Sequence, residues 1–215
     1  MKRIKIAEPE VSVRPIVETL EAMFTALNDK LFAGALEKPV ITVSPDTTKG
    51  ALGWFTTWRA WTRDNDDSLN ATSGYYEINC CAEHLARPIE EVVGTLLHEM
   101  VHLYNHQVGV KDTSRGGWYH NEQYRKAAEA HGLTVTKSDK YGWAHTALND
   151  ELKTWLVKQD AATFDLHRRA VPKKQRKTVK SHSIKYQCPC CGNSVRATKP
   201  VSIRCEDCDC LMDIA

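Results

Sequence analysis

The segment His98-Glu99-Met100-Val101-His102 holds two histidines four residues apart, with a glutamate directly after the first. Residues four apart lie one turn apart on one helix face, so both imidazoles can reach a single metal ion. Neutral imidazole is a good zinc ligand, and three protein ligands plus a water are typical of a catalytic zinc site. In that arrangement Glu99 can take a proton from the metal-bound water. The segment therefore indicates metal-assisted hydrolysis.

A third metal ligand must come from another part of the chain. His120 follows a polar, Gly-rich segment at 109–117 and opens the next expected helix, which would return the chain to the first one. Glu122 is the alternative, because some zinc peptidases use two histidines and a glutamate. His106 lies too far along the helix to close a tetrahedral site with both earlier histidines. We expect His120, with Glu122 left open.

The end of the chain carries a second group of potential metal ligands. Six of the eight cysteines lie in the last 28 residues, namely Cys188, Cys190, Cys191, Cys205, Cys208 and Cys210. Cys188, Cys191, Cys205 and Cys208 have the C-x₂-C-x₁₃-C-x₂-C spacing of a structural zinc site. Cys190 or Cys210 could replace one of them. A module this small has little core of its own, so the metal would supply its folding energy.

Hydrophobic spacing predicts the elements that position these residues. We expect an amphipathic helix at about 12–32 and a long helix at 88–107, whose apolar arc lies opposite the two histidines. The remaining predicted elements are strands at 40–43, 50–61 and 75–79, and helices at 120–131 and 146–160. This order indicates an α+β protein. Trp54, Trp58, Trp61, Tyr75 and Tyr76 are expected in its core, with a substrate cleft or base stacking as the alternative.

Charge is distributed unevenly along the chain. Residues 1–160 carry 18 Lys+Arg against 22 Asp+Glu, a balance of −4, whereas residues 161–215 carry 11 against 5, a balance of +6. The segment 168–185 has no acid and contains Arg168, Arg169, Lys173, Lys174, Arg176, Lys177, Lys180 and Lys185. Such a block is either a solvated linker or an arm that binds DNA phosphates. We expect a catalytic domain at 1–160, a basic linker at 161–185 and a zinc module at 186–215.

Two absences narrow the expected location. The chain has no apolar run of about 18 residues, which argues against a membrane-spanning helix. No apolar stretch follows the charged start of the chain, which argues against a secretory signal. We therefore expect a cytoplasmic monomer without a membrane partner. Tyr186 would give the zinc module one residue for stacking on single-stranded nucleic acid.

Two long stretches resemble a known family. These are LEAMFTALNDKLFAGALEKPVITVS at 20–44 and GYYEINCCAEHLARPIEEVVGTLLHEMVHLYNH at 74–106. They resemble the SprT-like metalloproteases, which include the DNA–protein crosslink protease Spartan. The family's third histidine, with an aromatic residue four positions later, maps onto His120 and Tyr124. This chain has Tyr119-His120-Asn121 where the family often has Gly-His-Gly.

The resemblance implies a zincin-like fold followed by a C-terminal zinc ribbon. It implies one catalytic zinc on His98, His102 and His120, with Glu99 as general base, and one structural zinc on the cysteines. The expected activity is an endopeptidase that cuts DNA-associated or DNA-crosslinked proteins. The alternative is a nucleic-acid-binding zinc protein whose histidine site is vestigial or non-proteolytic. The presence of Glu99 favours the enzyme, because a structural site needs no general base.

Overall fold

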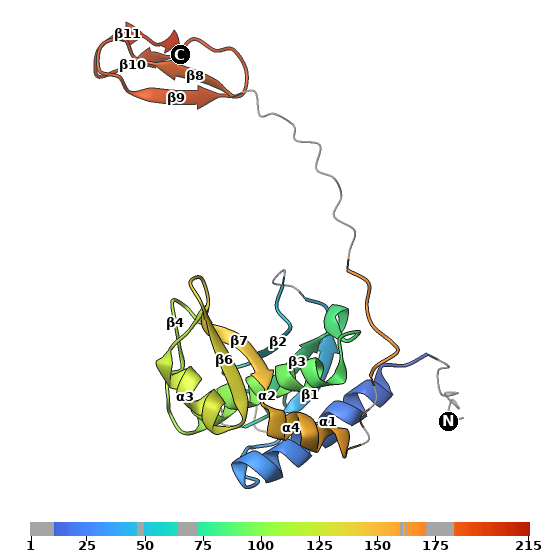
Figure 1. The fold of residues 1–215 in the computed structure, drawn as a ribbon. Helices are drawn as coiled ribbons and strands as arrows, with labels where there is room; N and C mark the ends of the chain where they lie inside the picture. Colours follow the sequence, from blue (N-terminus) through green and yellow to red (C-terminus); the bar gives the residue numbers. More distant parts are fainter. Residues whose placement is uncertain (1–10, 47–49, 64–72, 160, 162, 171–182) are drawn as a thin grey trace. The chain divides into compact units, whose positions relative to one another are not determined.

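The computed structural model describes residues 11–46, 50–63, 73–159, 161, 163–170 and 183–215. The chain divides into two compact units, Met1–Ala170 and Val171–Ala215. The described residues form four α-helices and several small sheets, so the expected α+β class is confirmed (Figure 1). Within the same residues, no helix has the length and apolar character needed to cross a membrane.

The four helices lie near their predicted positions. They are α1 (Arg14–Phe32), α2 (Ile89–Gln107), α3 (Glu122–Ala130) and α4 (Asp150–Val157). Asparagine caps set the starts of the last two, because the Asn121 side chain accepts from two backbone N–H groups of α3 and Asn149 accepts from one of α4. The prediction that α3 begins at residue 120 was therefore wrong, and His120 lies before the helix.

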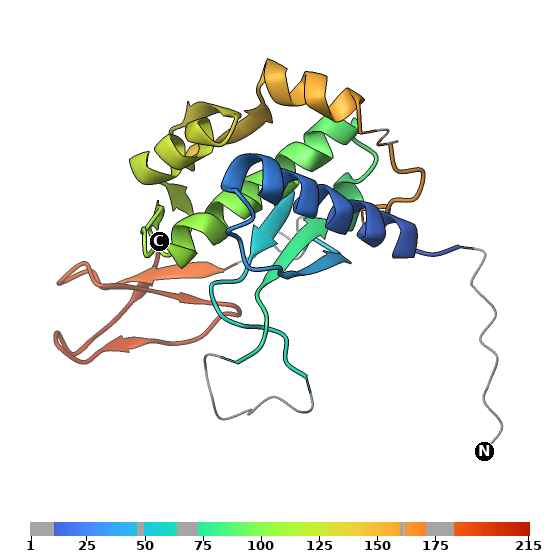
Figure 2. The same ribbon diagram turned by 90° about the horizontal axis from the view of Figure 1, so that it is seen from below.

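The first sheet supports the metal-binding helix. It contains β1 (Val40–Ser44), β2 (Gly53–Phe55) and β3 (Glu77–Cys81) in the order β1-β3-β2, with β2 antiparallel to β3 at one edge. The strand expected at 50–61 is thus only three residues long. Helices α1 and α2 lie together against this sheet (Figure 2). Their shared core includes Leu20, Ile78, Leu96 and Met100, none of which is exposed.

The second sheet holds the segment around His120. Its strands are β4 (Thr113–Ser114), β5 (Tyr119–His120), β6 (Leu133–Ser138) and β7 (Gly142–Leu148), in the order β4-β5-β7-β6. The hairpin of β6 and β7 was not predicted, and it includes residues 146–148, which were expected to be helical. At Gly142, with φ of 68°, an added Cβ would lie 2.1 Å from the His120 carbonyl oxygen. Glycine therefore allows β7 to pass close to the strand that carries His120.

Residues 161 and 163–170, which were expected to belong to the linker, are part of the first unit. Phe164 and Leu166 pack against its core. The Arg168 guanidinium lies 2.5 Å from Oε1 of Glu83, and its backbone N–H donates to the Ala82 carbonyl, next to the short 3-10 helix η1 (Ala82–His84). The apolar side chains at 164 and 166 explain why this segment packs against the core of the first unit.

The second unit consists of short strands. These are β8 (Ile184–Gln187), β9 (Ser194–Ala197), β10 (Arg204–Cys205), β11 (Cys210–Leu211) and β12 (Asp213–Ile214). They form a three-stranded sheet in the order β12-β8-β9 and a two-stranded sheet of β10 and β11. Lys185, which was placed in the linker, lies on β8. The six cysteines of this unit lie on or between these strands.

Candidate metal centres

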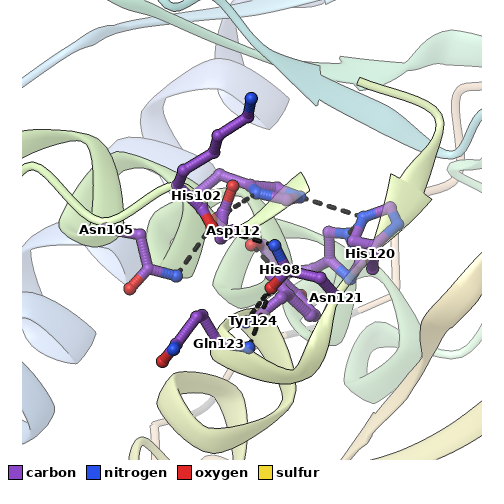
Figure 3. A network of polar contacts seen from close by, with 9 residues as sticks. His98, His102, Asn105, Asp112, His120, Asn121, Gln123 and Tyr124 are labelled. Carbon is purple, nitrogen blue, oxygen red and sulfur yellow. Dashed lines mark hydrogen bonds and ion pairs between the residues drawn. The ribbon is translucent and has the colours of Figure 1, made fainter. Parts of the chain in front are cut away.

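Three histidines from two distant segments meet in the first unit. His98 and His102 lie on α2, and His120 lies on β5 (Figure 3). Nε2 of His120 is 3.1 Å from Nε2 of His98 and 3.0 Å from Nε2 of His102. These three residues form a group that could hold one metal ion. Without a metal, one proton on Nε2 of His120 would have to be shared between Nε2 of His98 and Nε2 of His102. A divalent cation between the three rings would instead accept the lone pairs of all three nitrogens.

Hydrogen bonds at the other ring nitrogens orient two of the imidazoles. Nδ1 of His102 lies 2.7 Å from Oδ2 of Asp112, and the same oxygen accepts from the Asn105 amide at 3.1 Å. An ionised carboxylate only accepts, so Nδ1 carries the proton and Nε2 presents its lone pair. Nδ1 of His98 lies 3.0 Å from the Thr146 hydroxyl on β7.

Burial keeps two of the histidines neutral. It lowers the pKa of His98 well below its ordinary value, and it lowers the pKa of His120 to about 4. Burial also disfavours the charged form of His102. There the hydrogen bond to Asp112 and the charges of Glu99 and Asp112 outweigh burial, so the pKa of His102 is raised. Neutral His98 and His120 are ready to bind a metal, and Asp112 makes His102 a more basic ligand.

Glu99 is a buried carboxyl group close to the three histidines. Only 6% of the residue is exposed, and burial, with a smaller effect from Asp112, raises the pKa of Glu99 to about 7. A Cβ added at Gly53 of β2 would lie 3.4 Å from Oε1 of Glu99, so the strand approaches this carboxyl closely. A carboxyl group whose pKa is near 7 can both accept and return a proton at neutral pH.

The histidines and Glu99 line one large cleft. Its volume is about 1360 Å³, and its walls come from α2, from β2 and the residues before it, from the β4–β5 hairpin and from β6 and β7. Pockets for small molecules usually measure roughly 300–1,000 Å³. The cleft is therefore large enough for a segment of a polymer.

The second unit holds the predicted cysteine group. The Sγ atoms of Cys188, Cys191, Cys205 and Cys208 all lie within 4.8 Å of one another and could hold a metal ion. The Cys191 N–H contributes most to lowering the pKa of Cys188 to about 6, which favours the metal-binding thiolate. Gly192, with φ of 77°, forms the tight turn after the first pair.

The two remaining cysteines of this unit differ in position. Cys190 is exposed, whereas Sγ of Cys210 lies 3.4 Å from Sγ of Cys188. Cys210 is thus close enough to replace one of the four cysteines as a metal ligand.

The structure separates the other candidate ligands from the histidine site. Glu122 is exposed, forms ion pairs with Arg125 and is not part of the histidine group. His106 instead packs edge-on against the rings of Phe55 and Tyr76. Three residues that orient the site were missed in the sequence, namely Asn105, Asp112 and Thr146. Neither motif nor periodicity marks them, because their role depends on how a loop and a hairpin fold back onto α2.

The predicted nucleic-acid-binding residues are only partly described. Arg168 is engaged by Glu83, Arg169 is exposed, and Lys185 donates to Gln187 at 3.3 Å. Lys173, Lys174, Arg176, Lys177 and Lys180 lie outside the described residues.

The aromatic predictions need two corrections. Tyr186 cannot stack on bases as suggested, because it is 4% exposed and its hydroxyl accepts from the Val201 N–H. Trp58 and Trp61 are 65% and 45% exposed, so they are not core residues. Both residues follow β2, which ends at Phe55, and Trp61 pairs with Tyr75 only in an isolated β-bridge.

Comparison of the chain with models of protein families, with curated proteins and with solved structures found no match. The family resemblance therefore stays an expectation based on the residues quoted above.

We predict two zinc ions per chain, held by independent groups. The His98→Ala variant should keep one zinc and lose the other, and Cys205→Ser should do the reverse, because the two groups share no ligand. Metal analysis of the purified variants measures this directly. A single zinc in the wild type, unchanged in His98→Ala, would contradict the prediction.

We also predict that Asp112→Asn weakens metal binding at the histidine site by about 10- to 100-fold. The amide can still accept from His102 but lacks the charge that makes this imidazole more basic. A competition titration with a zinc chelator gives the affinity. Asp139→Asn, an exposed acid in the β6–β7 turn, serves as the control and should bind metal as the wild type does. Equal affinities in all three proteins would refute the role of Asp112.

Proposed function

We propose that this protein is a zinc-dependent endopeptidase of the SprT-like type. The observation that carries the proposal is the placement of a buried Glu99 beside three convergent imidazoles in one large cleft. A site that only stabilises the fold has no use for a carboxyl group whose pKa is about 7 next to an open cleft. On this view the first unit is a zincin-like domain and the second a zinc ribbon.

Each residue of the site has a separate task in the proposed reaction. His98, His102 and His120 would hold the zinc ion, and Asp112 and Thr146 fix the orientation of two of these rings. When bound, zinc supplies a Lewis acid for a water molecule and for the substrate carbonyl. The Glu99 carboxylate accepts the proton of the attacking water and then donates it to the amine that leaves.

The edge strand β2 offers a place for the substrate backbone. The Leu52 carbonyl accepts from Cys81, and the Thr56 N–H donates to Glu77, so these alternate residues face β3. The backbone groups of Gly53 and Phe55 then point to the free edge of the strand. Both residues line the cleft. An extended polypeptide can pair with this edge, with one of its peptide bonds placed over the histidine site.

The basic segment supports a second part of the proposal, that the enzyme acts on proteins associated with DNA or crosslinked to it. The described part of the second unit, 183–215, carries four basic and four acidic residues, so its net charge is zero. The positive charge that could attract DNA is therefore concentrated in 168–182. Clustered cations bind DNA by releasing its counterions, with little dependence on base sequence.

The basic segment also favours the alternative function, a nucleic-acid-binding zinc protein without proteolytic activity. The two proposals differ in what they require of Glu99. Only the enzyme needs its carboxylate, so one substitution separates them.

We predict that Glu99→Gln removes nearly all proteolysis, by ~10²–10⁴-fold, while zinc content and fold stay unchanged. The amide has nearly the same shape but cannot accept the proton from water. The test is cleavage of an unfolded protein substrate, with and without DNA. Glu122→Gln is the matched control and should cleave at the wild-type rate. Wild-type activity in Glu99→Gln would show that the proposed mechanism is wrong.

We predict that the basic segment determines the salt dependence of DNA binding. The variant to test has Gln in place of Lys173, Lys174, Arg176, Lys177 and Lys180. Each phosphate contact contributes about −0.9 to the slope of log affinity against log salt, so the loss of five contacts should make the slope about 4 to 5 less steep. The control replaces five exposed lysines elsewhere by Gln, namely Lys126, Lys137, Lys140, Lys158 and Lys199. If both variants keep the wild-type slope, the segment is only a solvated linker.

A further inference from the structure

One wall of the cleft carries an exposed tryptophan next to a proposed metal ligand. Trp118 lines the cleft, is 62% exposed and precedes His120 by two residues. It lies at the end of the β4–β5 turn. Neither the proposed metal binding nor the proton transfer by Glu99 uses this side chain.

Other exposed apolar side chains line the same cleft. Val110 and Tyr141 are 36% and 37% exposed, and Leu52, just before β2, is 41% exposed. Exposed apolar residues are ordinary when they are scattered singly, but several around one cleft indicate a binding surface. These side chains gain contact area only when an apolar group enters the cleft.

The backbone that carries Trp118 leaves the side chain room to adjust. Arg115, Gly116 and Gly117 all have positive φ, and a Cβ added at either glycine would meet no atom within 4 Å. The Arg115 guanidinium lies over the Tyr119 ring, 4.6 Å from its centre. The turn is thus held at its base, and the space beside its two glycines is open.

The charges in the cleft favour a polypeptide over a nucleic acid. The charged side chains that line it are mixed in sign, namely Arg87, Lys111, Lys153, Glu90, Glu91, Glu99 and Asp112. Grooves for single-stranded nucleic acid combine aromatic residues with an excess of positive charge, which this cleft lacks. The free edge of β2 in the same cleft instead suits an extended peptide.

We propose that Trp118, together with Val110 and Tyr141, forms a subsite that accepts one large apolar side chain of the substrate polypeptide. This inference rests on the proposed function, because it names the substrate preference of the same cleft. A peptide paired with β2 presents alternate side chains to the same side. One of them meets Trp118 close to the scissile bond, since Trp118 is two residues from His120.

The test uses two peptides that differ only in one residue near the cleavage site, Phe in one and Ala in the other. The wild-type chain should cleave the Phe peptide with a kcat/KM about 10- to 200-fold higher than that of the Ala peptide. In Trp118→Ala the preference should fall close to one, with zinc content unchanged. Trp58→Ala is the matched control, because Trp58 is 65% exposed and does not line the cleft. A preference that survives in Trp118→Ala would overturn the subsite.

A binding measurement separates the subsite from the proposed protease activity. Fluorescently labelled Phe and Ala peptides are titrated with Glu99→Gln and with the double variant that also carries Trp118→Ala. Tighter binding of the Phe peptide by Glu99→Gln, lost in the double variant, would support the subsite. This holds even if the wild type cleaves neither peptide, because absence of cleavage would contradict only the protease proposal. If the substitution at Trp118 weakens binding of an oligothymidine but of neither peptide, the occupant is a nucleobase and the subsite proposal fails.

Discussion

The constraint on which this structure depends is the convergence of three imidazole nitrogens from elements that are not adjacent in sequence. His120 must bring its Nε2 to about 3 Å from those of His98 and His102, although 17 residues separate it from His102 along the chain. Three features meet this demand. The Asn121 cap ends β5 directly after His120, Gly142 lets β7 pass beside it, and Asp112 holds the ring of His102 from the loop between them.

Burial connects this geometry to its chemistry. The same packing that partly buries the histidines lowers the pKa of two of them, and it raises the pKa of the buried Glu99. A buried cation is costly unless nearby groups compensate its charge. The lone pairs of the three imidazoles would do so for a metal ion shared among them. The histidine site faces a large cleft, which distinguishes it from the cysteine group in the second unit.

The sequence predicted those parts of the fold and site that depend on local patterns. Helices α1 and α2 follow from apolar spacing, His98 and His102 from their separation on a helix, and the cysteine group from its paired spacing. Thr146 and Asp112 were missed because their contacts arise from chain reversal, which leaves no local signal. The exposure of Trp58 could not be read from its type, because aromatic residues suit a core and a surface subsite equally.

The central claim is that the three histidines hold a zinc ion within reach of Glu99, and its most direct test is anomalous diffraction at the zinc edge from crystals of the zinc-loaded chain. We expect a peak bound to Nε2 of His98, His102 and His120 at about 2.0–2.1 Å. We also expect a water on the metal that lies within hydrogen-bond distance of the Glu99 carboxylate. A peak held by other side chains, or a metal whose four positions are all filled by protein, would contradict it.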